Sequence, residues 1–171
     1  VSERQRAVQG VEDARAFAEG IVQTVREPLV VLDADLRVRT ANRSFYRTFG
    51  VTPDETEGRF LFELGNRQWD IPRLRELLEE ILPRYSHFSD FEVEHEFEGI
   101  GRRSMVLNAR RLDSAGHRPG MILLAVEDAT ERLRTAEALA LSEVRYRRLF
   151  ETAQDGILLV DPESRRVSDA N

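Results

Sequence analysis

Histidine is the side chain best suited to metal binding or proton transfer near neutral pH, and His95 is the most informative of the three in this sequence. It lies on the apolar side of the alternating run 91–97, whose other side carries glutamates. An imidazole there could bind a haem iron or act as a pH switch, but a structural histidine with satisfied hydrogen bonds is favoured. His87 and His117 lie in loop-like segments. The spacing of the three matches no metal motif, so we expect no metal site.

Other reactive groups are missing from the sequence. It contains no cysteine, which excludes disulfides, thiolate metal ligands and cysteinyl–flavin photochemistry within this chain. The glycines of GIGRR (99–103) lie in a hairpin turn, not between a strand and a helix, so they form no phosphate-binding loop. No Ser-His-Asp set is suggested by position. We therefore expect no catalytic residues and no enzyme activity in this chain.

Charge and hydropathy exclude two further classes of partner. There are 31 acidic residues against 25 basic ones, a net charge of −6, so a nucleic-acid backbone would be repelled. The longest apolar run, around residues 121–126, is far shorter than the roughly 20 residues of a membrane-spanning helix. No secretory signal is found at the N-terminus. We expect a cytoplasmic domain with neither nucleic acid nor membrane as partner.

The elements that position these residues begin with an amphipathic helix at residues 1–26. Its apolar side chains recur at spacings of three and four, which places them on one face as a surface for a dimer: Val11, Ala14, Ala18, Ile21 and Val25. The strands 28–33 and 36–42 follow as a hairpin, and short helices fill residues 43–64. The clearest helix within the globular region is 68–82, which Pro83 is expected to end.

Three more strands are predicted at 91–97, 102–112 and 121–128. Strands 28–33 and 121–128 are apolar on both faces, which is typical of central strands. The pattern turns helical again from residue 130 to about 153, with Leu133, Ala136, Ala140 and Val144 at coiled-coil spacing. The element order indicates an α+β domain with a five-stranded antiparallel sheet, flanked by helices at both ends.

An internal repeat sets the domain boundaries. The segment EPLVVLDADLRVRTAN (27–42) is similar to DGILLVDPESRRVSDAN (155–171), and each copy follows a helix. Chance similarity of two hairpins is the alternative, but a repeat of this length is typical of tandem domains. We predict a helix at 1–26, a complete domain at 27–129, a connector helix at 130–153 and the start of a second domain at 154–171.

These features together resemble the PAS domain: the element order, the Ala-Asn pair that ends the second strand, and Asp128-Ala129-Thr130-Glu131 after the last strand. The strings GNRQWDIPRLRELLEEILP (65–83) and EVEHEFEGIGRRSMVLNARRL (92–112) are similar to PAS domains of bacterial sensor histidine kinases, including those fused to chemotaxis-type methylesterase and methyltransferase domains. The resemblance implies sheet order 2-1-5-4-3 with helices on one face. The other apolar face then needs a cover, either the leading helix or a second copy, so we expect a homodimer.

The resemblance also assigns a role to the exit of the last strand. Asp128 and Thr130 lie where that strand passes into the connector helix, and Thr130 can cap this helix. In the family that the sequence resembles, this Asp-x-Thr junction couples movement of the strand to the coiled coil. An ordinary helix cap is compatible with that role.

A ligand pocket is expected between the sheet and the helices. Its tentative lining is aromatic and aliphatic apart from one histidine: Phe45, Phe49, Trp69, Leu74, Leu78, His95, Met105, Leu107 and Leu123. A packed core is the alternative and is favoured. No cofactor is expected, although non-covalent flavin binding beside Asn66 and Trp69 stays open. Haem is disfavoured because the helix 68–82, where such PAS domains usually place their ligand, contains no histidine.

Three functions remain for this chain. The leading one is a PAS sensory and signal-relay module of a two-component protein, which passes conformational change through its helices to adjacent PAS and kinase domains. The second is a ligand-free spacer that only dimerises. The third is a redox or gas sensor that binds flavin or haem.

Overall fold

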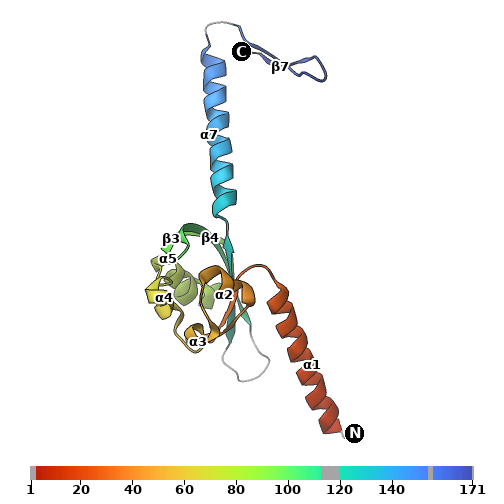
Figure 1. The fold of residues 1–171 in the computed structure, drawn as a ribbon, viewed down its shortest axis with the longest axis vertical. Coiled ribbons are helices and arrows are strands. Elements are labelled where there is room, and N and C mark those ends of the chain that lie inside the picture. Colours follow the sequence, from red (N-terminus) through yellow and green to blue (C-terminus); the bar gives the residue numbers. More distant parts are fainter. Residues whose placement is uncertain (1–2, 113–119, 154–155, 171) are drawn as a thin grey trace. The chain divides into compact units, whose positions relative to one another are not determined.

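The computed structural model describes residues 3–112, 120–153 and 156–170. It divides into two units, residues 1–129 and 130–171. The first contains helix α1 (Glu3–Thr24) and a five-stranded sheet with short helices gathered on one face (Figure 1). The predicted connection at 113–119 and Asn171, the last residue of the sequence repeat, lie outside the described residues.

The sheet consists of five strands that pair in antiparallel fashion: β1 (Leu29–Leu32), β2 (Val38–Ala41), β3 (His87–Phe97), β4 (Gly101–Leu112) and β5 (Met121–Asp128). Their order is β2-β1-β5-β4-β3, which confirms the α+β class, the predicted order and the central position of β1 and β5. Strand β3 begins at His87 and not at residue 91. A bulge between Phe88 and Phe91, with Asp90 at φ +56°, lets the pairing continue past the break in the alternation.

The helical layer is made of short segments between β2 and β3: α2 (Arg43–Phe49), α3 (Pro53–Thr56), a 3₁₀ turn η1 (Leu61–Glu63), α4 (Leu64–Arg67), α5 (Pro72–Arg75), a π-helical turn η2 (Glu76–Ile81) and α6 (Leu82–Tyr85). Two of these helices carry caps. The Asn42 side chain caps α2, and Gly50 ends it with φ +63°. Thr52 and Glu55 form the capping box of α3.

The helix predicted at 68–82 is built differently. It begins at Pro72, because Ile71 precedes a proline and is held in an extended conformation with ψ 122°. It also continues through Pro83 to Tyr85 and does not end there. Pro83 has no N–H to donate to the carbonyl four residues earlier, and the chain widens into the π-helical turn η2 before it.

Three consecutive residues at the end of α4 adopt the left-handed conformation. The φ values of Gly65, Asn66 and Arg67 are 50°, 59° and 65°, and such a conformation costs roughly 1–2 kcal/mol for each residue that carries a Cβ. The Gln68 side chain crosses this turn and accepts the N–H of Glu98 through Oε1 at 2.9 Å. The strained turn is thereby held against the β3–β4 hairpin.

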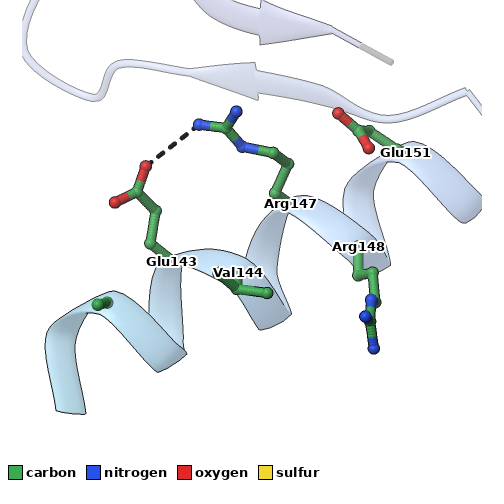
Figure 2. Close-up of a pocket in the computed structure, with 6 residues that line it drawn as sticks. Glu143, Val144, Arg147, Arg148 and Glu151 are labelled. Carbon is green, nitrogen blue, oxygen red and sulfur yellow. Dashed lines mark hydrogen bonds and ion pairs between the residues drawn. The ribbon is translucent and has the colours of Figure 1, made fainter. Parts of the chain in front are cut away.

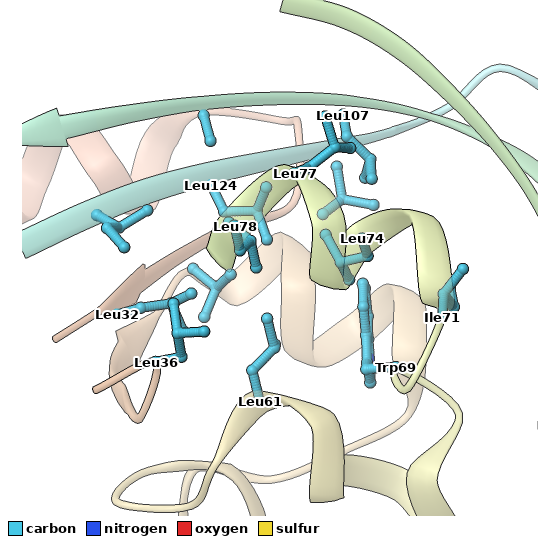
Figure 3. Packing of buried hydrophobic residues seen from close by; sticks show 14 of the residues in the cluster. Leu32, Leu36, Leu61, Trp69, Ile71, Leu74, Leu77, Leu78, Leu107 and Leu124 are labelled. Atoms are coloured by element: carbon cyan, nitrogen blue, oxygen red, sulfur yellow. The ribbon is translucent and has the colours of Figure 1, made fainter. Parts of the chain in front are cut away.

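The core lies between this helical layer and the inner face of the sheet (Figure 3). Strands and helices contribute apolar side chains that are at most 2% exposed, among them Leu32, Leu61, Trp69, Leu74, Leu77, Leu78, Leu107 and Leu124. Burial of one such side chain is worth roughly 1.5–3 kcal/mol. The helices are short and irregular, so their positions are set by this packing more than by helix propensity.

The second unit contains α7 (Thr130–Thr152) and a hairpin of β6 (Leu158–Val160) and β7 (Val167–Ala170). The register of this hairpin shifts between Leu159 and Val160, the positions that the repeat aligns with the irregularity between Val31 and Leu32 in β1. The aligned aspartates at 33 and 161 both accept backbone N–H groups of their own turns. The similarity therefore extends from sequence to local geometry.

The length and hydropathy of the helices show whether any of them could span a membrane. None of those in the described ranges is both long and apolar enough to cross a membrane.

Gly65→Ala tests the strained turn. A Cβ at position 65 would lie 2.1 Å from Nε2 of Gln68, whereas one at Gly58, which also has positive φ, would meet nothing within 4 Å. We expect Gly58→Ala to lower the free energy of unfolding by about 1–2 kcal/mol through backbone conformation alone. Gly65→Ala should lower it by at least about 1 kcal/mol more, as measured by chemical unfolding. Equal losses for the two variants would contradict this geometry.

Candidate functional site

The predicted pocket residues of the helices form one aromatic cluster. The ring of Trp69 lies 5.6 Å from that of Phe45 and 4.8 Å from that of Phe49, measured between centroids. Phe97 of β3 closes the cluster at 5.4 Å from Trp69. These contacts bring the end of α2, the segment before α5 and the edge of the sheet to one place.

The predicted aliphatic residues divide between the two faces of the sheet. Leu74, Leu78, Met105 and Leu107 are buried in the core, as placed by the sequence. Leu123 is not, because alternation along β5 buries Leu124 and leaves Leu123 half-buried on the opposite face. A strand that is apolar on both faces carries no signal for its register, and a one-residue shift exchanges the faces.

His95 lies apart from the aromatic cluster's centre. Its ring is half-buried and contacts the edge of Phe97, with centroids 5.2 Å apart. It lines an open hollow between the left-handed turn at 65–68 and the β3–β4 hairpin. Among the described residues, no group of three or more histidine, aspartate or glutamate side chains could hold a metal ion.

A pocket of about 300 Å³ reaches the aromatic cluster from the helical side. Phe45 and Trp69 form part of its apolar lining, and polar side chains surround them: Glu55, Arg59, Glu63, Asn66 and Gln68. Its volume is at the lower end of the range for small-molecule sites. The arrangement could hold a small planar molecule against the two rings. Sequence analysis placed the pocket deeper, between helix and sheet, where Leu74 and Leu78 fill the space.

The junction after β5 is held by its neighbour β4. Asp128 ends the strand opposite Met105, and its Oδ2 lies 3.7 Å from Nη1 of Arg103. The N–H of Ala129 donates to the carbonyl of Ser104 at 3.0 Å. Helix α7 begins at Thr130 itself, whose side chain is 4% exposed. Asp128 and Ala129, the two residues before α7, are therefore attached to β4.

Apolar side chains on both flanking helices are exposed. On α1 the predicted Val11, Ala14, Ala18 and Ile21 face solvent, joined by Phe17, which is 71% exposed. Val25 is half-buried. Phe17 lies three residues after Ala14 and four before Ile21, so it belongs to the same face, and it was missed in the sequence.

Helix α7 also exposes apolar side chains to solvent. Leu133 is half-buried and Ala140 is exposed, as are Leu139, Leu141 and Val144. Charged residues surround a shallow hollow beside Ala140 and Val144. Two of them, Glu143 and Arg147, form an ion pair (Figure 2), with 3.2 Å between Oε1 and Nη2. An apolar seam bordered by ion pairs is typical of a helix that packs against another helix.

The outer face of the sheet carries a further apolar surface. Leu29 and Val106 are buried there, Val31, Leu123 and Ala125 are half-buried, and Leu112 and Met121 are exposed. We call these seven residues the outer-face patch. It occupies the two central strands, which the sequence predicted to be apolar on both faces, and also β4.

Comparison with known proteins identifies the family. A profile described as the PAS fold matches residues 22–134, and one described as a PAS domain matches residues 144–171. The chain belongs to the PAS family. A PAS domain is a sensory module that is not itself catalytic. A search of curated proteins finds no match.

Solved PAS structures share this fold at low sequence identity. The PAS domain of Bordetella pertussis BvgS is 23% identical with a TM-score of 0.51, and the alignment covers 76% of this chain and 98% of that one. A PAS domain from a two-component sensor histidine kinase is 11% identical with a TM-score of 0.55, covering 69% and 98%. An RNA-binding light-oxygen-voltage receptor is 15% identical with a TM-score of 0.62, covering 76% and 37%.

The carboxyl of Glu27, next to the outer-face patch, provides a test by pH. Partial burial, and then the negative charge of Glu127, raise its pKa above the usual value. Ionised Glu27 therefore destabilises the fold above its folded-state pKa, and this cost vanishes below about pH 4, where the unfolded chain is protonated too. We expect Glu27→Gln to raise the thermal midpoint at pH 7 and to have no effect below about pH 4. The exposed Glu12→Gln is the control; a gain for Glu27→Gln that is independent of pH would contradict the assignment.

Proposed function

We propose that this PAS domain is a dimeric signal-relay module of a two-component sensor histidine kinase. Its flanking helices hold two copies together, and conformational change in the core passes through them to adjacent domains of the same protein. The observation that carries the proposal is the coincidence of three unpartnered apolar surfaces in one chain: the exposed faces of α1 and α7, and the outer-face patch.

A second copy is the occupant that best fits these surfaces. Leu112 and Met121 are 38% and 39% exposed, so the face of the sheet that the short helices leave open is incompletely covered. Phe17 and its apolar neighbours on α1 are also exposed, because this helix packs against little else along most of its length. Helix and patch are both present in every copy, so two chains can cover each other's surfaces by one symmetric arrangement.

The junction at Asp128 supports the relay. Its ion pair with Arg103 and the bond from Ala129 to Ser104 attach the start of the connector to β4. Strand β4 pairs with β3, whose Phe97 contacts Trp69 beside the pocket. A continuous set of contacts therefore leads from the pocket to Ala129, the residue that precedes α7 in the chain. The match of a PAS profile to residues 144–171 supports the tandem array in which α7 would connect two domains.

A cofactor-binding sensor is the second candidate. The pocket at Phe45 and Trp69 favours it, since an apolar lining with polar side chains around it suits a small ligand such as a flavin. Visible absorbance in the purified chain would support this alternative, whereas a colourless chain that retains the dimer would support the relay or the spacer.

Phe17→Asp tests dimerisation. The substitution places a charge in the exposed apolar face of α1, and loss of one buried aromatic contact per copy should weaken association at least about tenfold. Sedimentation should give twice the 19.7 kDa of one chain for the unmodified protein and a shift toward monomer for the variant. Tyr85→Asp, at a residue that is 65% exposed and outside all three surfaces, is the matched control. A monomeric unmodified chain, or equal effects of both substitutions, would overturn the dimer.

A further inference from the structure

Asn42 has a fully buried side chain whose two polar atoms bond in opposite directions. Its Oδ1 accepts the N–H groups of Leu29 and Phe45, each at 2.9 Å. The first bond fixes the start of β1 and the second caps α2. Both lone pairs of this oxygen are therefore used within the globular part of the domain.

The Nδ2 group of Asn42 faces the end of α1. It donates to the carbonyl of Glu27 at 2.8 Å and lies 3.2 Å and 3.3 Å from the carbonyl oxygens of Val22 and Val25. Of these three acceptors, Val22 lies in the last turn of α1, where carbonyls lack partners within the helix, and Val25 and Glu27 follow the helix. Gln23 of α1 also accepts the N–H of Arg43 at 2.9 Å, so the bonds of Asn42 share the attachment of α1 with this contact.

Helix α2 connects this anchor to the pocket. Its first turn is capped by Asn42, and further along it carries Phe45 and Phe49, whose rings contact Trp69. A movement of α2 that accompanies a change in the aromatic cluster must therefore displace Asn42. The two longer bonds, to Val22 and Val25, are the first that such a displacement would break.

We propose that Asn42 is a positioning residue that couples the pocket helix α2 to α1. Oδ1 keeps the residue fixed to α2 and β1, while Nδ2 holds or releases the last turn of α1. The inference rests on the proposed relay and extends it to the N-terminal side of the domain, separate from the junction at Asp128.

Asn42→Asp separates the two halves of this contact. Aspartate keeps the acceptor oxygen and is an equally good helix cap, but it removes the amide donor and faces the α1 carbonyls with a second oxygen. We expect amide hydrogen exchange of residues 20–27 in the full chain to accelerate about tenfold. Exchange in β4 and β5 should change less than about twofold. Unchanged exchange at 20–27, or an equal rise in β4 and β5, would overturn the proposal.

Two further variants keep the test decisive. Asn108→Asp makes the same chemical change at a residue whose Oδ1 accepts the N–H of Asp90 at 2.8 Å, and it should leave residues 20–27 unaffected. If Asn42→Asp unfolds the chain through its buried charge, Asn42→Ser replaces it. Serine still caps α2 but is too short to reach the α1 carbonyls, and the same local pattern is expected.

A double-mutant cycle measures the coupling itself. Phe49→Leu alters the aromatic cluster at the far end of α2. With Asn42 present, it should accelerate amide exchange at residues 20–27 at least about threefold. With Asp at position 42, the same substitution should accelerate this exchange less than about 1.5-fold. Additive effects would show that α2 and α1 are not coupled through this residue. Exchange on α1 requires neither dimer nor kinase. The coupling of α2 to α1 through Asn42 can therefore be confirmed even if the dimer or the relay to α7 fails. If the dimer and the relay are confirmed but this coupling is not, only the role of Asn42 is overturned.

Discussion

The two apolar faces of the central strands are the constraint on which the rest of this structure depends. Strands β1 and β5 carry apolar side chains on either side, and the short helices between β2 and β3 cover one of them. Those helices are irregular because they follow the shape of the core: one contains a left-handed turn and another is a π-helical turn that precedes Pro83. The second face remains the reason to expect another copy of the chain.

Sequence patterns predicted the sheet well because alternation and turn residues act locally. The order of strands followed from the family resemblance and from the central position of β1 and β5. The same patterns failed where tertiary contacts decide. Leu123 was assigned to the wrong face because a doubly apolar strand has no register signal. The bonds from Asn42 to Val22 and Glu27 join segments that no local pattern relates. Gln68 likewise acts across the fold, on Glu98.

Both ends of the domain are attached by polar contacts, while the centre is apolar. Asn42 holds α1, and Arg103 with Ser104 holds the residues before α7. Hydrogen bonds are directional and are lost over small displacements, whereas apolar packing tolerates sliding of similar size. A shift in the core can therefore release or retain a flanking helix without unfolding the domain. In the relay that we propose, this difference would allow small movements of the core to be transmitted.

The most direct test of the relay measures whether a change beside the pocket reaches α7. Trp69→Leu enlarges the space next to Phe97, and the contacts through β3 and β4 lead from there to Asp128. Hydrogen exchange at Ala129 and in the first turn of α7 should change at least about threefold, while the central part of α7 changes less than about 1.5-fold. A response confined to the neighbours of Trp69, with the first turn of α7 unaltered, would contradict the account.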